Sequence, residues 1–157
     1  MTIKLLYVGK TDAKELAVLI QDYQQRIGHF CKFEAILIPD LKNRKKLDQN
    51  QQKIEEGKKI LEKISTSDML VLLDEKGKEF TSEKFAMWMQ KQMNTGIKNV
   101  VFVIGGPYGF SEEVYQKASA KIALSQMTFS HQMVRLFFTE QVYRAFSILN
   151  NLPYHHA

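Results

Sequence analysis

Two patterns of apolar residues alternate along this chain. Short apolar runs rich in β-branched residues are typical of strands buried in a parallel sheet, and apolar residues recurring every three or four positions are typical of amphipathic helices. The runs predict five strands, at 3–8, 33–38, 69–73, 100–104 and 121–124, and the periodic segments predict five helices, at 12–27, 47–64, 81–96, 112–118 and 131–149. The alternation predicts an α/β fold, a mostly parallel sheet flanked by helices.

The length and the spread of apolar residues indicate one domain. The chain has 157 residues, 45% of them apolar, with no internal repeat, low-complexity segment or long linker, so we expect a single domain over residues 1–157. No stretch approaches the roughly 20 apolar residues of a membrane span, and no signal peptide is recognisable. A soluble, cytoplasmic protein without membrane contact is expected. Cys31, the single cysteine, is predicted to be a buried or half-buried thiol, and no metal site is implied.

Positive charge is in excess and is unevenly distributed. Lys and Arg number 22 against 17 Asp and Glu, a net charge of +5, which suits a polyanionic partner without requiring one. The segment 42–46, Lys-Asn-Arg-Lys-Lys, places four cations in five residues just after the second predicted strand. Two interpretations stay open: a solvated loop before a polar helix, or a segment that contacts phosphates.

A glycine turn follows the fourth predicted strand. Residues 105–109 read Gly-Gly-Pro-Tyr-Gly, and Ser111 then provides an N-cap for the next helix. Glycines at the end of a strand expose backbone amides where no Cβ obstructs a ligand. The turn has neither the Lys-Ser/Thr ending of a P-loop nor the spacing of a dinucleotide fingerprint, and the serines are not on a nucleophile elbow. We therefore expect a ligand site of another kind.

Turns after three predicted strands are expected to form one pocket. They begin at Leu73, at Gly105 and at Leu124. In open parallel sheets, ligands bind beyond the carboxyl ends of the strands, so these turns can converge. The third turn, 124–129, mixes small polar and apolar side chains that can enclose a planar base, although an ordinary loop closing the sheet edge fits the same residues.

The C-terminal segment 150–157 is dense in hydrogen-bonding and aromatic groups. It fits either a frayed terminus or part of an active site, because Tyr and His stack on unpaired bases and a histidine can take a proton from a ring nitrogen. Arg144, on the helix before it, fits either a surface cation or a clamp for a phosphate or carboxylate. The last helix also carries more apolar residues than one face can bury in a monomer, which predicts an obligate dimer.

Four motifs, in order and at matching intervals, make the chain similar to the RlmH-type ribosomal RNA methyltransferases of the SPOUT class. They are Leu-Leu-Asp-Glu-Lys-Gly-Lys (72–78), Phe-Val-Ile-Gly-Gly-Pro-Tyr-Gly (102–109), Leu-Ser-Gln-Met-Thr-Phe-Ser-His (124–131), and Tyr-Arg-Ala (143–145) with Asn-Leu-Pro-Tyr-His (151–155). The resemblance covers the chain end to end. It implies a SPOUT-type fold with a trefoil knot within about 70–157, and a homodimer whose active site is shared between subunits.

The same resemblance implies methyl transfer from S-adenosylmethionine to N3 of a pseudouridine in 23S ribosomal RNA, on the assembled ribosome and without a metal. Tyr154 and His155 are then candidates for positioning the base and assisting loss of its N3 proton, and Arg144 for orienting the nucleotide. The base itself is not assigned. The implied cofactor contacts are Leu73, Gly105, Gly106, Leu124, Ser125, Gln126, Met127, Thr128 and Phe129.

Two alternatives accompany this interpretation. One is a basic module without catalytic activity that docks on ribosomal RNA through 42–46, which predicts a steep salt dependence and no cofactor pocket. The other is a SPOUT methyltransferase that acts on a different RNA, such as a transfer RNA. The absence of an appended RNA-binding domain favours the ribosome.

Overall fold

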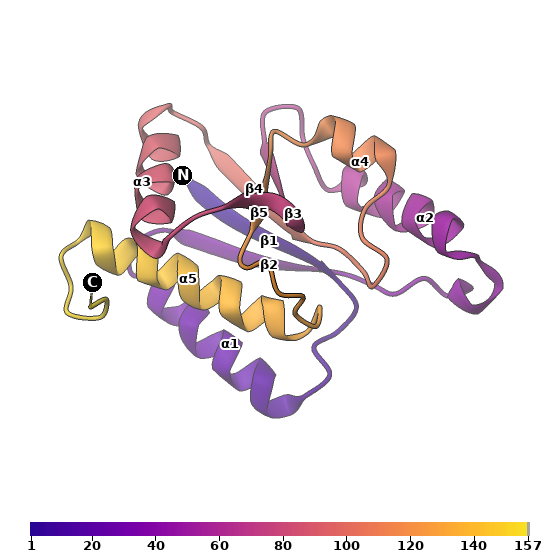
Figure 1. Ribbon diagram of the computed structural model, residues 1–157, viewed down its shortest axis with the longest axis horizontal. Coiled ribbons are helices and arrows are strands. Elements are labelled where there is room, and N and C mark those ends of the chain that lie inside the picture. Colours follow the sequence, from indigo (N-terminus) through magenta and orange to yellow (C-terminus); the bar gives the residue numbers. More distant parts are fainter. Residues whose placement is uncertain (157) are drawn as a thin grey trace.

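A computed structural model describes residues 1–156 and contains one five-stranded sheet. All strand pairs are parallel and the strand order is β2-β1-β4-β3-β5. The predicted α/β class, with a parallel sheet flanked by helices, is confirmed (Figure 1). The strands are β1 (Thr2–Val8), β2 (Lys32–Ile38), β3 (Met69–Glu79), β4 (Asn99–Ile104) and β5 (Ala120–Ala123).

Helices cover both faces of the sheet and enclose two apolar cores (Figure 1). Helices α1 (Lys14–Ile27), α3 (Ser82–Asn94) and α5 (Met133–Leu149) lie on one face, and α2 (Gln49–Glu62) and α4 (Glu112–Lys117) on the other. Successive residues of β4 point to opposite faces. Phe102 therefore belongs to the core under α5, and its neighbours Val101 and Val103 belong to the core under α2.

Polar caps set several helix starts where the sequence indicated them. The Ser111 Oγ accepts a hydrogen bond from the Val114 N–H, and the Thr81 Oγ1 accepts one from the Lys84 N–H, so both residues are N-caps. Asp48 forms a capping box with Gln51 at the start of α2. Helix α2 begins at Gln49, slightly later than predicted, because Asp48 is its N-cap; a short 3-10 helix, η1 (Arg44–Lys46), precedes it in the basic segment.

Strand β3 is longer than the sequence predicted. A strand ending at Leu73 and a turn beginning there were expected, but β3 continues to Glu79 through an irregularity in which Leu73 and Lys78 both pair with Ile122 of β5. Gly77 permits this irregular pairing of β3 with β5, because a Cβ there would lie 2.6 Å from the Ile122 backbone nitrogen. The expectation of a turn was wrong because pairing with β5, formed much later in the chain, outweighs the local turn signal.

Arg135, fully buried in the first turns of α5, ties this helix to the loop after β1. One guanidinium nitrogen donates to the Val8 carbonyl oxygen at 2.8 Å and another to Thr11 Oγ1 at 3.2 Å. The guanidinium also lies over the Tyr7 ring, 4.6 Å from its centroid. These contacts fix the start of α5, and with it the segment 124–132 that precedes the helix.

Cys31 is half-buried, as predicted. Burial raises the pKa of its thiol to about 11, so the thiolate that reacts or binds metals is scarce at neutral pH. Over residues 1–156, no helix combines the length and apolar character that crossing a membrane requires.

Candidate functional site

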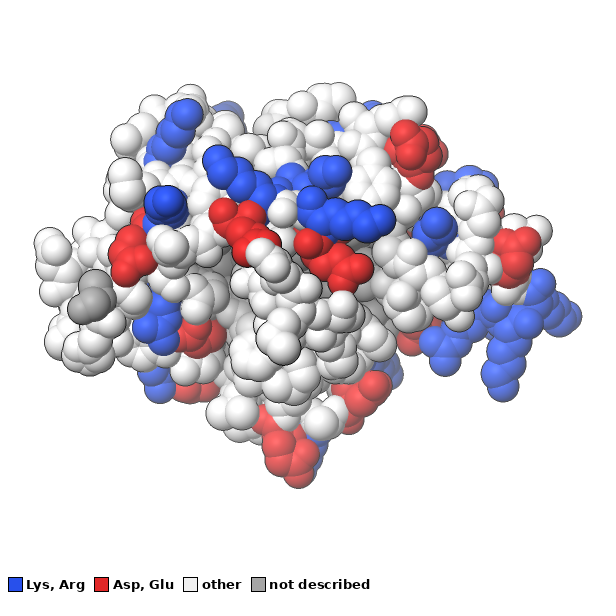
Figure 2. All heavy atoms as spheres, in the orientation of Figure 1, with Lys and Arg blue, Asp and Glu red and all other residues white. Residues whose placement is uncertain are grey.

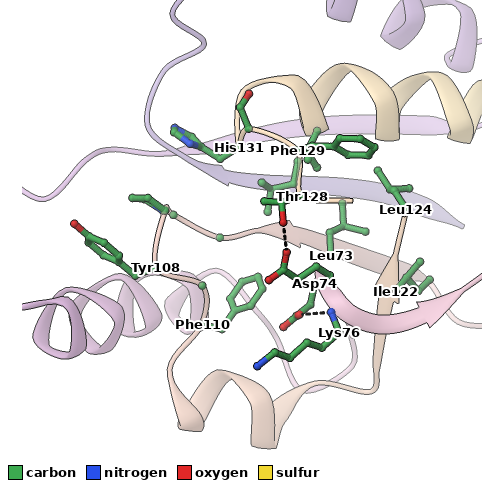
Figure 3. A pocket seen from close by; sticks show the side chains of 18 of the residues that line it. Leu73, Asp74, Lys76, Tyr108, Phe110, Ile122, Leu124, Thr128, Phe129 and His131 are labelled. Carbon is green, nitrogen blue, oxygen red and sulfur yellow. Dashed lines mark hydrogen bonds between the residues drawn. The ribbon is translucent and has the colours of Figure 1, made fainter. Parts of the chain in front are cut away.

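A cavity of about 490 Å³ opens at the carboxyl edge of the sheet, beyond the ends of β4 and β5 and beside residues 73–76 in the middle of β3 (Figure 3). This volume lies within the roughly 300–1,000 Å³ of small-molecule sites. Most of the wall comes from residues 73–76 of β3 and from the predicted turns after β4 and β5, with Tyr115 of α4 and Val134 of α5. The turns converge because parallel strands end at the same edge.

All but one of the predicted cofactor contacts line this cavity. Gln126 is the exception: its side chain is exposed and does not contribute to the wall. Ser125 shapes the turn itself, since its Oγ accepts a hydrogen bond from the Met127 N–H at 3.0 Å. The predicted residues brought together are Leu73, Gly105, Gly106, Leu124, Ser125, Met127, Thr128 and Phe129.

One side of the cavity carries carboxylates that the sequence analysis did not assign to the site. Asp74 accepts hydrogen bonds from the Tyr115 hydroxyl and, at 2.8 Å, from the Lys76 N–H. Thr128 Oγ1 donates to Glu75 Oε2 at 2.7 Å, which joins β3 to the third turn across the site (Figure 3). Burial, together with Asp74, raises the pKa of Tyr115, so Tyr115 remains a hydrogen-bond donor at neutral pH. Asp74 and Glu75 therefore place two carboxylates on this wall, next to the cationic Lys76.

The glycine turn is shaped by contacts with the protein behind it. A Cβ on Gly106 would lie 2.5 Å from Glu56 Oε2 of α2, and one on Gly105 would lie 3.1 Å from the Phe110 ring. Glu56 is buried, which raises the pKa of its carboxyl, and its Oε1 accepts a hydrogen bond from Gln52 Nε2 at 3.0 Å. Glycine is therefore required at 105 and 106 because a side chain would collide with Glu56 or Phe110. The sequence had indicated a different reason, namely space for a ligand.

Tyr154, His155 and Arg144 come together in one network near the C-terminal end of α5. Glu140 Oε1 accepts hydrogen bonds from the Tyr154 hydroxyl at 2.9 Å and from Arg144 Nε at 3.0 Å. The Arg144 guanidinium also lies over the Tyr154 ring, and its terminal nitrogen is 3.2 Å from His155 Nδ1. His155 Nε2 lies 2.9 Å from Glu83 Oε1 of α3. The tail is therefore held in place and is not frayed.

The network fixes the protonation pattern of its members. Arginine only donates hydrogen bonds, so His155 Nδ1 accepts and Nε2 carries the proton donated to Glu83. Burial and hydrogen bonding to Tyr23 and Glu140 raise the pKa of Tyr154, so its phenol stays protonated at neutral pH. In this arrangement neither nitrogen of His155 offers a free lone pair to a ring N–H.

The tail network does not line the cavity. Val134, in the wall, and Arg144 are ten helical positions apart on α5, or about 15 Å along its axis. A second hollow of about 280 Å³, bordered by Phe129, Phe137 and Glu140, lies between them. The sequence-predicted site residues therefore form two groups within one chain.

Comparison with known proteins shows to which family the chain belongs. The family model described as "Predicted SPOUT methyltransferase" matches residues 1–155. The chain belongs to the SPOUT methyltransferase family. The resemblance recognised in the four motifs is thereby confirmed.

Relatives of this SPOUT methyltransferase match it over nearly its whole length. Proteins named ribosomal RNA large subunit methyltransferase H are 65% identical in Christiangramia forsetii and 59% identical in Flavobacterium johnsoniae, each over 99% of both chains. A solved structure of a probable methylase family protein from Haemophilus influenzae is similar with a TM-score of 0.51 at 11% identity, covering 99% of this chain and 70% of that one. The solved structure supports the fold alone.

The contact between His155 and Glu83 predicts how stability of this SPOUT methyltransferase varies in acid. The hydrogen bond from His155 is the largest of the effects that hold the pKa of Glu83 at about 2, below the roughly 4.3 of a glutamate in an unfolded chain. The contact therefore stabilises the fold above pH 4.3, and this contribution is lost as the pH falls towards 2. Between pH 5 and 2 we expect the urea midpoint of the wild type to fall more steeply than that of Glu83→Gln. Parallel curves would contradict the contact.

Proposed function

We propose that this SPOUT methyltransferase transfers a methyl group from S-adenosylmethionine to N3 of a pseudouridine in 23S ribosomal RNA on the assembled ribosome. The observation that carries the proposal is the cavity at the carboxyl edge of the sheet, which is lined by the residues expected to hold the methyl donor. The names of relatives up to 65% identical support the RNA class. The proposal places the protein in the cytoplasm, with the ribosomes.

The residues of the cavity fit this methyl donor. Leu73, Leu124 and Phe129 offer apolar surface for the adenine, and the backbone of the three turns offers amides and carbonyls to its edge. Asp74 and Glu75 offer negative charge to a cationic ligand. Over residues 1–156 no cluster of His, Cys, Asp and Glu could hold a metal ion, and the proposed reaction includes none.

Bound in this cavity, the cofactor supplies a methyl group activated by its sulfonium. The chain then has to align the acceptor N3 with that methyl and allow the N3 proton to leave as the new bond forms. Tyr154 and Arg144, fixed on Glu140, present a phenol and a guanidinium that can position the base. Since Tyr154 is protonated and both nitrogens of His155 are engaged, we assign the tail to positioning and the N3 proton to solvent.

A homodimer would bring the two groups of site residues together. Within one chain the tail lies about 15 Å from the cavity along α5, so the proposed site is completed by the tail of a second chain. Helix α5 leaves Met133 and Phe137 exposed by 38% and 40%, which is apolar surface available for such contact. Light scattering at micromolar concentration is expected to give twice the 18.2 kDa of one chain. A monomeric mass would contradict the shared site.

Two expectations from the sequence stay predictions alongside the function. One is the trefoil knot within about 70–157, and the other is the single-domain organisation over 1–157. Unfolding that follows one transition by fluorescence and by circular dichroism would support a single cooperative domain.

The function is tested by transfer of a radiolabelled methyl group to ribosomes that lack the modification. Label in 23S RNA of assembled ribosomes, and none in protein-free 23S RNA or transfer RNA, is the expected result. Label in transfer RNA alone would favour the second methyltransferase interpretation. Ribosome binding without transfer and without binding of S-adenosylmethionine would favour the docking module.

A further inference from the structure

The basic segment 42–46 lies at the same edge of the sheet as the cavity. It follows β2, and the cavity lies beyond the ends of β4 and β5 and beside the middle of β3, so both lie at the edge where β2, β4 and β5 end. Only β1 separates β2 from β4 in the sheet. At about 4.8 Å between neighbouring strands, β2 and β4 are about 10 Å apart. The segment therefore flanks the site instead of standing on a remote face.

The cations of this segment are exposed but anchored. Lys42, Lys45 and Lys46 are exposed and take part in no ion pair within residues 1–156, whereas Arg44 pairs with Asp40 at 3.3 Å. Figure 2 shows Lys and Arg side chains gathered at this end of the molecule, beside the start of α2. The buried Leu41 on one side and the capping box of α2 on the other hold the segment in place.

One more cation connects the segment with the cavity. Lys10 lies in the loop after β1, the strand between β2 and β4, and its side chain is exposed. Gln132, which leads into α5, donates to the Lys10 carbonyl oxygen at 3.0 Å and so fixes this loop beside the cavity wall. Tyr108, 45% exposed, lies at the rim. Along the strand order, positive charge thus runs from the segment to the rim.

We propose that this basic edge, defined as Lys10, Lys42, Arg44, Lys45 and Lys46, binds the phosphate backbone of the substrate RNA next to the nucleotide that enters the cavity. The inference rests on the proposed function, because a nucleotide in the cavity brings its flanking phosphates to this edge. Residues 39–48 expose no large apolar side chain that could form the centre of a protein interface. Lysines that are not paired with carboxylates can bind phosphates. Lysine–phosphate contacts raise the affinity for RNA and fix the position of the protein on it, but they do not recognise the base sequence.

The test replaces three lysines, Lys42→Ala, Lys45→Ala and Lys46→Ala, in one variant. Methyl transfer to ribosomes that lack the modification is then measured over a range of salt. We expect KM for ribosomes to rise at least tenfold, with kcat and the affinity for S-adenosylmethionine changed by less than twofold. The slope of log affinity against log salt should fall by about 2 to 3, since each phosphate contact contributes about 0.7 to 0.9.

A matched control removes the same charge at the opposite edge. Lys63, Lys91 and Lys98 are exposed near the ends of α2 and α3 and just before β4, on the amino side of the sheet. Changing these three to alanine should leave KM and the salt slope at wild-type values. Equal effects of the two triple variants, or no effect of either, would overturn the assignment.

A second measurement separates this inference from the proposed function. A photo-crosslinker placed at Lys45 should label ribosomal RNA when the protein is mixed with the same ribosomes, and binding of fluorescent protein to them gives a Kd without any turnover. If the wild type transfers no methyl group, the function fails while these readouts still test the surface. Crosslinks confined to ribosomal proteins would overturn the RNA assignment.

Discussion

Replacing Gly77 by alanine is expected to lower the free energy of unfolding by about 3 kcal/mol or more. The new Cβ would lie 2.6 Å from the Ile122 nitrogen and 2.7 Å from two backbone carbons of β5, all of them main-chain atoms that no rotamer change can move away. Strands β3 and β5 would have to separate beneath the cavity. Urea unfolding, followed by circular dichroism, measures the loss.

Gly96 provides the control for this substitution. Gly96, unlike Gly77, has a positive φ, of 79°, but nothing lies within 4 Å of the position of its Cβ, so Gly96→Ala should cost only the roughly 1–2 kcal/mol of a left-handed backbone. A Gly77→Ala variant as stable as the wild type, or no less stable than Gly96→Ala, would contradict the close approach of Gly77 to the backbone of β5.

Removal of residues 154–157 is expected to reduce methyl transfer about a hundredfold, because misplacing a reacting group by about 1 Å already costs that much. The deletion takes away the phenol and imidazole held by Glu140 and Glu83. Because the cavity lies about 15 Å from these groups along α5, the affinity for S-adenosylmethionine should change by less than twofold. Single-turnover transfer on ribosomes and calorimetric titration measure the two quantities.

A shorter truncation is the matched control for the tail. Removing only residues 156 and 157 keeps Tyr154 and His155 with their partners, and should keep transfer within about threefold of the wild type. A chain that lacks residues 154–157 but transfers methyl groups at the wild-type rate would show that the tail is not part of the reaction.

The fold could be predicted from the sequence because each element carries its own local signal. The apolar run 100–104 is buried on both faces, and Ser111 caps the helix that the sequence indicated. The continuation of β3 past Leu73 could not be predicted, since its polar residues are ordered by β5, more than forty positions later. Arg135, which resembles a surface cation in the sequence, is buried only because the loop after β1 accepts its hydrogen bonds.

The sequence was sufficient to predict which backbone segments form the candidate site, but not which side chains pair within it. Segments at the carboxyl edge of a parallel sheet converge by topology, so Leu73, Gly105 and Leu124 were placed together correctly, although Leu73 lies within β3 and not in a turn. The pairing of Asp74 with Tyr115 joins residues 41 positions apart, and that of His155 with Glu83 joins residues 72 apart. Such pairs depend on tertiary geometry, and a single sequence carries no periodicity or spacing that reports it.

The most direct test of the account is calorimetric titration with S-adenosylmethionine of the wild type, Ser125→Trp and Gln126→Trp. Ser125 lines the cavity whereas its neighbour Gln126 does not, so an indole at 125 should fill the site and one at 126 should leave it open. Saturable binding by the wild type and Gln126→Trp, with at least tenfold weaker binding by Ser125→Trp, is the predicted result. No binding by the wild type, or equal binding by all three, would contradict the assignment of this cavity to the methyl donor.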